Sequence, residues 1–159
     1  MTQPAVERFL ASVAPLGLEP EVREFDESTH TAAEAAAAIG CEVAAIVKSL
    51  LFEADGAPLL VLASGPNRVD TTALGARLGA TIGKADAAAV KQATGYSIGA
   101  VPPFGHVTPL RTVFDETLLD IPVVWAAAGS PTAVFAIAPA ELARLTNSEI
   151  LPIAERRFG

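Results

Sequence analysis

The residue with the clearest chemical potential is Lys48, within the segment 46–52 (IVKSLLF). The segment is rich in apolar and β-branched residues and leads to Asp55-Gly56, which predicts a strand followed by a tight turn. Side chains alternate between the faces of a strand, so Lys48 would be the charged member of an apolar face formed by Ile46, Leu50 and Phe52. Such a lysine either snorkels to water near a sheet edge or is held as a cation that meets an anionic or polarised ligand. This segment alone leaves both interpretations open.

A second candidate is the stretch 95–106 (GYSIGAVPPFGH), whose glycines and prolines exclude regular helix and central strand. Glycines let a backbone approach a ligand and prolines stiffen the loop, so its N–H groups could face a developing oxyanion. The alternative is a rigid surface crossover. The candidate residues of this loop are Gly99, Ala100, Val101, Pro102, Pro103, Gly105 and His106, the last as a group that orients water or substrate.

A third candidate is Asn67-Arg68, just before a predicted helix that begins at Asp70. An arginine beside exposed helix N–H groups suits a phosphate. Equally, Arg68 could be a solvated loop residue, with Asp70 serving only as a cap. Asp115, Glu116 and Asp120 gather around a turn and are expected to be solvated, with Asp115 the one able to face a pocket. His30 is expected to have a structural or solvent role.

Several familiar chemistries are missing from the sequence. It has no Gly-x-Ser-x-Gly elbow, no phosphate-binding loop motif and no histidine pair with metal spacing. With one cysteine and two histidines, no metal, cofactor or internal disulfide is expected, and the single cysteine suits a reducing cytoplasm. An enzyme built this way would work by binding and electrostatics.

The totals describe one compact domain spanning residues 1–159. Hydrophobic residues are 51% and charged residues 18% of the chain. No apolar run is long enough to span a bilayer, and the N-terminus does not resemble a signal peptide. The net charge of −7 argues against a broad nucleic-acid-binding surface, though not against a small pocket for one end of a nucleic acid.

Periodicity and capping residues predict helices and strands that alternate irregularly, which indicates an α+β fold. Helices are predicted over 3–15, 31–40, 70–78, 86–95 and 139–145. Strands are predicted over 22–25, 46–52, 59–63, 81–82, 113–114, 123–127, 133–138 and 150–153.

Together, the lysine strand Ile46–Leu50 and the Gly99-x-x-x-Pro103 loop resemble motifs of the aminoacyl-tRNA editing family, also called YbaK/EbsC-like or prolyl-tRNA synthetase-associated domains. The order of elements fits over about residues 29–146. The resemblance implies a mixed, largely antiparallel, barrel-like sheet surrounded by helices. It also implies a cytoplasmic deacylase that acts in trans on the ester of mischarged tRNA, mostly tRNA for proline carrying a small wrong amino acid.

In that resemblance, Lys48 is the essential lysine near the 3′-terminal adenosine, and Gly99 carries the loop that positions the scissile carbonyl. The implied partners are the aminoacyl-tRNA acceptor end and an aminoacyl-tRNA synthetase, with no membrane and no DNA. Ala100 replaces a glycine found in many members, and the segment 126–130, which includes the candidate Gly129, matches neither the cysteine-specific nor the alanine-specific pattern. A non-catalytic module of the same fold that binds a nucleotide or a tRNA end is the alternative.

Overall fold

The computed structural model describes residues 4–26 and 31–154, so His30 lies outside the described residues. The helices begin and end where the local sequence predicts. Thr31, Asp70 and Asp86 each accept a hydrogen bond from a backbone N–H of the first helical turn, and Gly40, Gly79 and Gly95 end those helices in the left-handed region. The α-helices are α1 (Pro4–Val13), α2 (Ala32–Ile39), α3 (Thr71–Leu78), α4 (Ala87–Thr94) and α5 (Pro139–Thr146).

The strands form two sheets. The strands are β1 (Val22–Glu24), β2 (Val47–Ala54), β3 (Ala57–Ser64), β4 (Ile82–Lys84), β5 (Arg111–Asp115), β6 (Val124–Ala127), β7 (Ala133–Ile137) and β8 (Glu149–Leu151). One sheet has the order β4-β2-β3-β5-β8 and the other the order β1-β7-β6. The pairs β3/β5 and β5/β8 are parallel and the rest antiparallel, which confirms the mixed, largely antiparallel α+β fold.

The two sheets meet at one point and do not close into a single barrel. An isolated parallel bridge joins Ile46, just before β2, to Trp125 of β6. On the same side of β2, the pairing with β4 is confined to Phe52–Ala54. The stretch of β2 between the bridge and β4 therefore has no strand partner on this side among the described residues and forms a free edge of the sheet.

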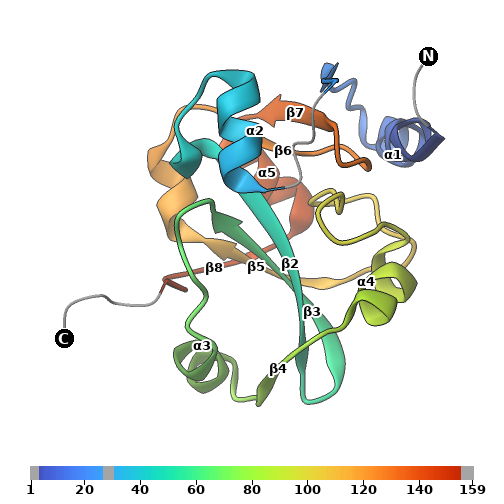
Figure 1. The fold of residues 1–159 in the computed structure, drawn as a ribbon. Helices are drawn as coiled ribbons and strands as arrows, with labels where there is room; N and C mark the ends of the chain where they lie inside the picture. The colour runs from blue at the N-terminus through green and yellow to red at the C-terminus, as the bar shows by residue number, and fades with distance from the viewer. Residues whose placement is uncertain (1–3, 27–30, 155–159) are drawn as a thin grey trace.

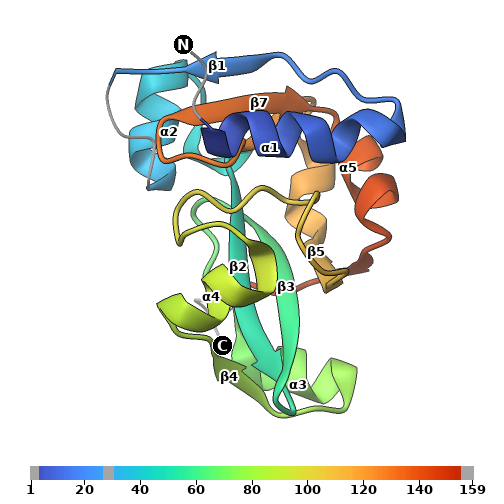
Figure 2. The ribbon, with the colours of Figure 1, turned by 90° about the vertical axis from the view of Figure 1, so that its right-hand side faces the viewer.

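The helices cover the sheets on different sides (Figures 1 and 2). Helix α1 lies across β7, and α4 with the loop that follows it passes over β2 and β3, whereas α3 and β4 lie at the opposite end from β7. The main core contains Phe9 of α1, whose ring lies 5.8 Å from that of Phe104 and 5.1 Å from that of Phe135. A second cluster fills the other face of the five-stranded sheet beneath Leu74 of α3.

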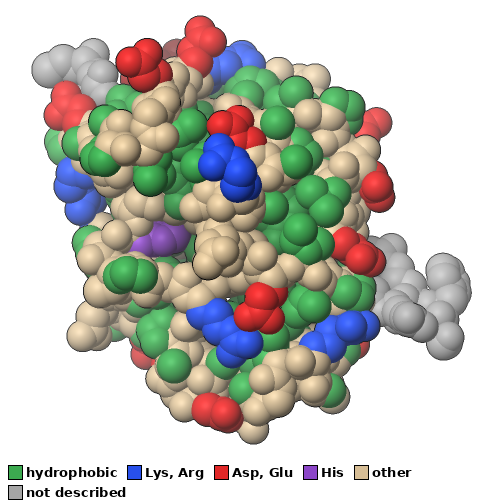
Figure 3. Space-filling model, turned by 180° about the vertical axis from the view of Figure 1, so that it is seen from behind, with side chains coloured by type: hydrophobic (Ala, Val, Ile, Leu, Met, Phe, Trp, Pro, Cys, Tyr) green, Lys and Arg blue, Asp and Glu red, His purple; other side chains and the backbone are tan. Residues whose placement is uncertain are grey.

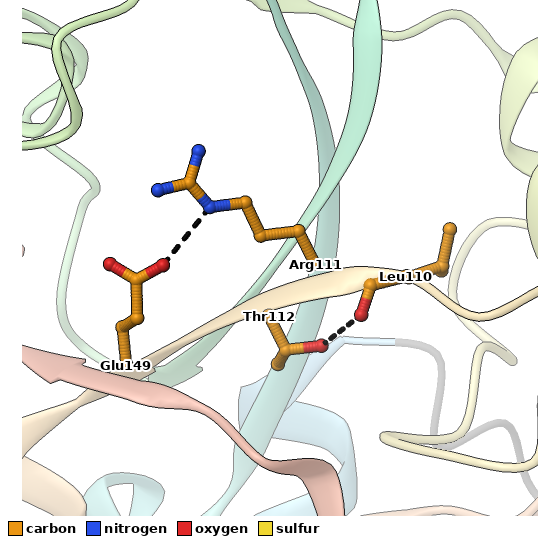
Figure 4. Close-up of polar contacts among 4 residues, drawn as sticks. All are labelled: Leu110, Arg111, Thr112 and Glu149. Atoms are coloured by element: carbon orange, nitrogen blue, oxygen red, sulfur yellow. Dashed lines mark hydrogen bonds and ion pairs between the residues drawn. The ribbon is translucent and has the colours of Figure 1, made fainter.

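Polar contacts at the β5–β8 edge are peripheral (Figure 4). Arg111 Nε lies 3.0 Å from Glu149 Oε1, and Thr112 Oγ1 donates to the Leu110 carbonyl. Both charged side chains are about half exposed, so the ion pair contributes little to stability. Among residues 4–26 and 31–154, no helix has the length and apolar character needed to cross a membrane.

Candidate functional site

Lys48 lies on β2 with the apolar neighbours that alternation predicts. The antiparallel register places Lys48 opposite Ala63, and Leu50 opposite Val61. Leu50 packs against the same cluster as Val61 and Ala63, so this face is apolar apart from the lysine. The lysine is half-buried, and its Nζ donates a 2.7 Å hydrogen bond to the main-chain carbonyl of Asn67. The ammonium is therefore held by a specific acceptor and retains two other N–H donors.

Asn67 is held in turn by a buried carboxylate. Its Nδ2 donates to Asp115 Oδ2 at 2.8 Å and to Thr117 Oγ1 at 3.1 Å. Asp115, only 1% exposed, also accepts from the backbone N–H groups of Ser64 and Thr117, each at 3.0 Å. The expectation that Asp115 is solvated together with Glu116 and Asp120 is therefore wrong for Asp115. Its side chain, at the end of β5, is buried in the core.

The electrostatic surroundings of Lys48 act in opposite directions. Burial lowers the pKa of Lys48 because it disfavours the charged form. The Asp115 carboxylate acts to raise this pKa, and the nearby Arg68 guanidinium acts to lower it further. Arg68 itself is exposed.

A cavity of about 270 Å³ brings the lysine strand and the glycine loop together. Its walls come from four regions: the free edge of β2, the N-terminal part of α2, the loop after α4, and β6 with β7. Lys48, Gly99 and Val101 all line it, although they come from segments far apart in the sequence. Thus two of the three sequence candidates converge on one cavity, and the Asn67-Arg68 segment lies beside it through the Lys48 hydrogen bond.

The cavity walls are mostly small and apolar. Ala126 and Ala127 of β6 line it together with Trp125, while Ala32 and Ala35 approach from α2. Sequence reasoning did not assign Trp125 to the site, because its role depends on β6 meeting the start of β2, which only the three-dimensional fold reveals.

Ser49 is a second residue that sequence reasoning missed. Its Oγ is buried and has no hydrogen-bond partner among the described residues, and Ser49 lines the cavity. A buried hydroxyl without a partner costs free energy. Because Ser49 directly follows Lys48 in β2, its side chain points to the opposite face of the strand from the ammonium. The only sequence signal was its position next to Lys48.

The glycine loop has fewer available donors than its sequence indicates. Gly99 adopts φ 84°, a conformation that favours glycine. The Ala100 N–H donates to the Ser97 carbonyl at 2.9 Å, so this donor is already used within the loop. The Gly99 and Val101 N–H groups remain as candidate donors to a ligand in the cavity.

The other predicted residues lie around the loop and outside this cavity. Ala100 and Gly129 line a separate cavity of about 400 Å³, and Pro103 lines another of about 650 Å³. Gly105, with φ +78°, lies so close to α1 that an added Cβ would be 2.4 Å from Ser12 Oγ.

The side chain of His106 makes its hydrogen bond within its own loop. Its Nε2 hydrogen-bonds the Pro102 carbonyl at 2.6 Å, and burial lowers the pKa of the imidazole. Pro102 is buried. These contacts link the two ends of the Pro102–His106 turn, while a direct role in substrate binding stays a prediction for this group.

The described residues offer no cluster of side chains for a metal-dependent chemistry. Within residues 4–26 and 31–154, no group of three or more His, Cys, Asp or Glu side chains could hold a metal ion. The site is therefore defined by a half-buried ammonium, a glycine-containing loop and a small apolar cavity.

Comparison with known proteins shows the family of this chain. A model of the aminoacyl-tRNA editing domain matches residues 26–145, which contain both Lys48 and Gly99. The chain belongs to the aminoacyl-tRNA editing domain family.

Three individual proteins illustrate the similarity. The uncharacterized protein YwhH of Bacillus subtilis (strain 168) is 30% identical over 133 residues, which are 83% of this chain and 85% of YwhH. The crystal structure of a candidate trans-editing enzyme for prolyl tRNA synthetase is 40% identical with a TM-score of 0.93, covering 98% of this chain and 100% of that one. The crystal structure of hypothetical protein APE2540 is 27% identical with a TM-score of 0.86, covering 93% of this chain and 99% of that one.

Proposed function

We propose that this protein is a stand-alone aminoacyl-tRNA deacylase that hydrolyses the ester of mischarged tRNA, with tRNA for proline carrying a small wrong amino acid as its substrate. The observation that carries the proposal is the convergence of Lys48 and the Gly99 loop on one cavity. The family assignment and the similarity to a candidate trans-editing enzyme support it. Proofreading of this kind takes place in the cytoplasm, where charged tRNA is used.

In this proposal, Lys48 binds the terminal phosphate or the ribose edge of the tRNA. The hydrogen bond to the Asn67 carbonyl fixes the direction of the ammonium and leaves its other N–H groups for the ligand. Positioning by a preorganised charge is effective because the orientation of the substrate is set before the reaction begins. Arg68, exposed beside this point, adds positive charge where the nucleic acid approaches.

The hydrolytic step requires little from the protein. Water attacks the carbonyl carbon, the bond to the ribose oxygen breaks, and that oxygen takes up a proton. The free ribose hydroxyl assists the water. With cysteine as the amino acid, its thiol can attack the carbonyl carbon in place of water: a cyclic thioester forms, the bond to the ribose oxygen breaks, and that oxygen takes up the thiol proton. The N–H groups of Gly99 and Val101 stabilise the oxyanion. Because the ester is already activated, lowering the barrier by about 4–6 kcal/mol gives a thousandfold acceleration or more.

The cavity supports a small amino acid. Ala126 and Ala127 present small side chains beside Lys48 and Gly99, so this part of the cavity wall suits a small amino acid side chain. The correct amino acid, proline, would be discriminated against by the shape of this wall.

The test is release of labelled amino acid from tRNA for proline charged with alanine, cysteine, serine or proline. Wild type is compared with Lys48→Ala and with the control Lys84→Ala, which removes an exposed lysine from β4 of the same sheet. We expect rapid hydrolysis of one mischarged ester, slow hydrolysis of the correct one, loss of activity in Lys48→Ala and full activity in Lys84→Ala.

Two results would overturn the proposal. One is a wild-type rate in folded Lys48→Ala. The other is lysine-dependent binding of the acceptor end with no hydrolysis of any ester, which would identify a non-catalytic module of the same fold. A synthetase added to the reaction shows whether such a partner is required.

A further inference from the structure

The side chain of Asn67 points inward, and its amide nitrogen Nδ2 is fully engaged. An amide group has two N–H donors, and the two contacts of Asn67 Nδ2, to Asp115 Oδ2 and Thr117 Oγ1, use both. The main-chain carbonyl of the same residue accepts from Lys48 Nζ. Asn67 is therefore a link between a buried carboxylate and the lysine of the site.

We propose that Asp115 and Asn67 are positioning residues for Lys48, which orient its ammonium toward the cavity without touching the substrate. The inference rests on the proposed function, because it assumes that the ammonium of Lys48 acts in the site. In this hydrogen-bonded cluster of Asp115, Asn67 and Lys48, the buried Asp115 carboxylate holds the Asn67 side chain, and the Asn67 carbonyl accepts from Lys48. Together Asp115 and Asn67 hold the loop after β3 in place.

Asp115 is a suitable fixed point because of its place in the sheet. It ends β5, an inner strand that lies between β3 and β8, and it is buried. Its two oxygens accept from Ser64 N, Thr117 N and Asn67 Nδ2 at 2.8–3.0 Å. Hydrogen bonds to an ionised acceptor are about twice as strong as neutral ones, so this cluster holds the loop after β3 firmly.

Asn67 holds the hydrogen-bond acceptor of Lys48 in place. Its own N–H donates to the Ser64 carbonyl at 2.9 Å, which closes a turn directly after β3. With its side-chain Nδ2, its N–H and its main-chain carbonyl all engaged, the residue has little freedom to move. The acceptor for Lys48 is thereby fixed in space, and the long, flexible lysine side chain is directed by one well-placed partner.

The charge of Asp115 provides a second, electrostatic contribution. The charged groups that act on Lys48 are Asp115, at the end of β5, and Arg68, in the loop after β3. Asp115 favours the ammonium form and offsets part of the effect of burial, so it helps to keep Lys48 charged. A purely structural hydrogen-bond cluster would have no such effect on the titration of Lys48.

The experiment compares Asn67→Ala, Thr117→Val and Asp115→Asn with the matched control Asp70→Ala. Thr117→Val removes one acceptor of the Asn67 amide but keeps the Thr117 N–H that bonds Asp115. Asp70→Ala removes the N-cap of α3, a hydrogen bond in the same loop region that does not lead to Lys48. Each variant is first tested for folding by thermal unfolding, and kcat and KM are then measured well below the unfolding temperature.

We expect kcat/KM to fall about 10- to 100-fold in Asn67→Ala, because a misplacement of the substrate by about 1 Å causes losses of this order. Thr117→Val should show a smaller loss in the same direction. Asp70→Ala should keep wild-type kinetics even if its unfolding temperature is lower. Equal kinetic losses in Asn67→Ala and Asp70→Ala would overturn the proposal.

A direct titration of Lys48 separates this proposal from the proposed function. The chain has three lysines, Lys48, Lys84 and Lys91, so protein labelled with ¹³C at the lysine Cε gives few signals to assign by lysine-to-arginine variants. We expect the pKa of Lys48 to be lower in Asp115→Asn than in wild type, and unchanged in Asp70→Ala.

The titration gives a result even if no tRNA is hydrolysed. An unchanged Lys48 titration in folded Asp115→Asn would refute the electrostatic part of the proposal. If Asp115→Asn does not fold, Asn67→Ala serves instead: its Lys48 Cε signal should change in chemical shift because the acceptor is no longer fixed. A wild-type shift in that variant would refute the positioning role.

Discussion

Replacing Lys48 with methionine should separate the charge of this residue from its hydrocarbon stem. Methionine keeps an unbranched apolar side chain against Leu50 and Val61 but removes the ammonium. The substitution removes one hydrogen bond, the one that Lys48 Nζ donates to the Asn67 carbonyl at 2.7 Å. We expect the variant to fold as well as wild type and to lose most of its deacylase activity.

The magnitudes follow from the surroundings of the side chain. A hydrogen bond from a charged group contributes about 1.5–3 kcal/mol, but its loss is offset because the half-buried ammonium no longer has to be desolvated. The net change in the free energy of unfolding should therefore be within about 1 kcal/mol. The loss of the charge that holds the terminal phosphate or ribose edge should misplace the ester and reduce kcat/KM about 10²-fold.

The pH dependence gives a sharper test, because stability and activity should move in opposite directions. The folded-state pKa of Lys48 lies below its ordinary value of 10.5, so the folded protein disfavours the ammonium at pH values below that pKa. This cost disappears as the pH rises through the folded-state pKa toward 10.5, and wild type should gain stability relative to Lys48→Met. Activity that needs the ammonium should fall over the same range.

The assays are urea unfolding of both proteins at neutral and alkaline pH, and deacylation rates corrected with Lys48→Met for spontaneous ester hydrolysis in base. The reasoning is refuted if Lys48→Met loses several kcal/mol of stability at neutral pH, or if it retains the wild-type rate. An alkaline loss of activity that also occurs in the methionine variant would show that another group titrates.

Four further outcomes are expected. Gly99→Ala should introduce about 1–2 kcal/mol of backbone strain at φ 84° and lower the deacylation rate at least tenfold. Gly83→Ala is the control, because Gly83 has an ordinary φ and open space around an added Cβ, and it should change neither stability nor rate. Thermal unfolding followed by circular dichroism and deacylation kinetics test both variants. Ser49→Ala should leave the unfolding temperature equal to or slightly above that of wild type, since the buried hydroxyl has no partner among the described residues. Ala127→Leu should fill part of the cavity and abolish hydrolysis while the unfolding temperature is kept. The affinity for acceptor-end RNA should fall with salt with a slope of about −1.4 in log–log form, as expected for about two single-strand phosphate contacts, and a much steeper slope in filter binding would contradict a compact site.

The elements that the sequence predicts well are those set by local chemistry. The Asp55-Gly56 turn forms with φ 50° and 84°, and joins β2 and β3 in an antiparallel hairpin. The capping residues Thr31, Asp70 and Asp86 each bond to a backbone N–H three residues ahead. In all these cases the partners lie within a few residues, so a short window of sequence contains the whole interaction.

The last strand shows how one proline limits such local prediction. The pattern predicts a strand over 150–153, whereas β8 covers Glu149–Leu151 and ends before Pro152. Proline has no N–H to contribute to a sheet. The next residue, Ile153, instead gives its carbonyl to the Asp70 N–H at 2.8 Å, which ties the C-terminal segment to the start of α3.

The core of the candidate site depends on partners that are distant in sequence. Asp115 bonds to Ser64 and Asn67, which precede it by 51 and 48 residues. The parallel pairing of β3 with β5 creates this proximity, and no local pattern reveals it. For this reason the sequence indicates the chemical types, namely the lysine and the glycine loop, but does not show that the acidic residue at the end of β5 is part of the lysine's support.

The acidic charge of the chain and a nucleic-acid substrate are compatible if positive charge is concentrated and not spread over the surface. On the face shown in Figure 3, Lys and Arg side chains are scattered and some lie beside Asp or Glu. Among the described residues, Arg111 and Arg144 form ion pairs with Glu149 and Glu141. Lys48 differs from these because it is half-buried, fixed by a carbonyl and lines a cavity. In a site of lower dielectric one such charge acts more strongly than several exposed ones, which are screened by water and salt. The cost of holding it there is offset by Asp115, buried where its charge supports the ammonium without exposing a carboxylate to an approaching phosphate.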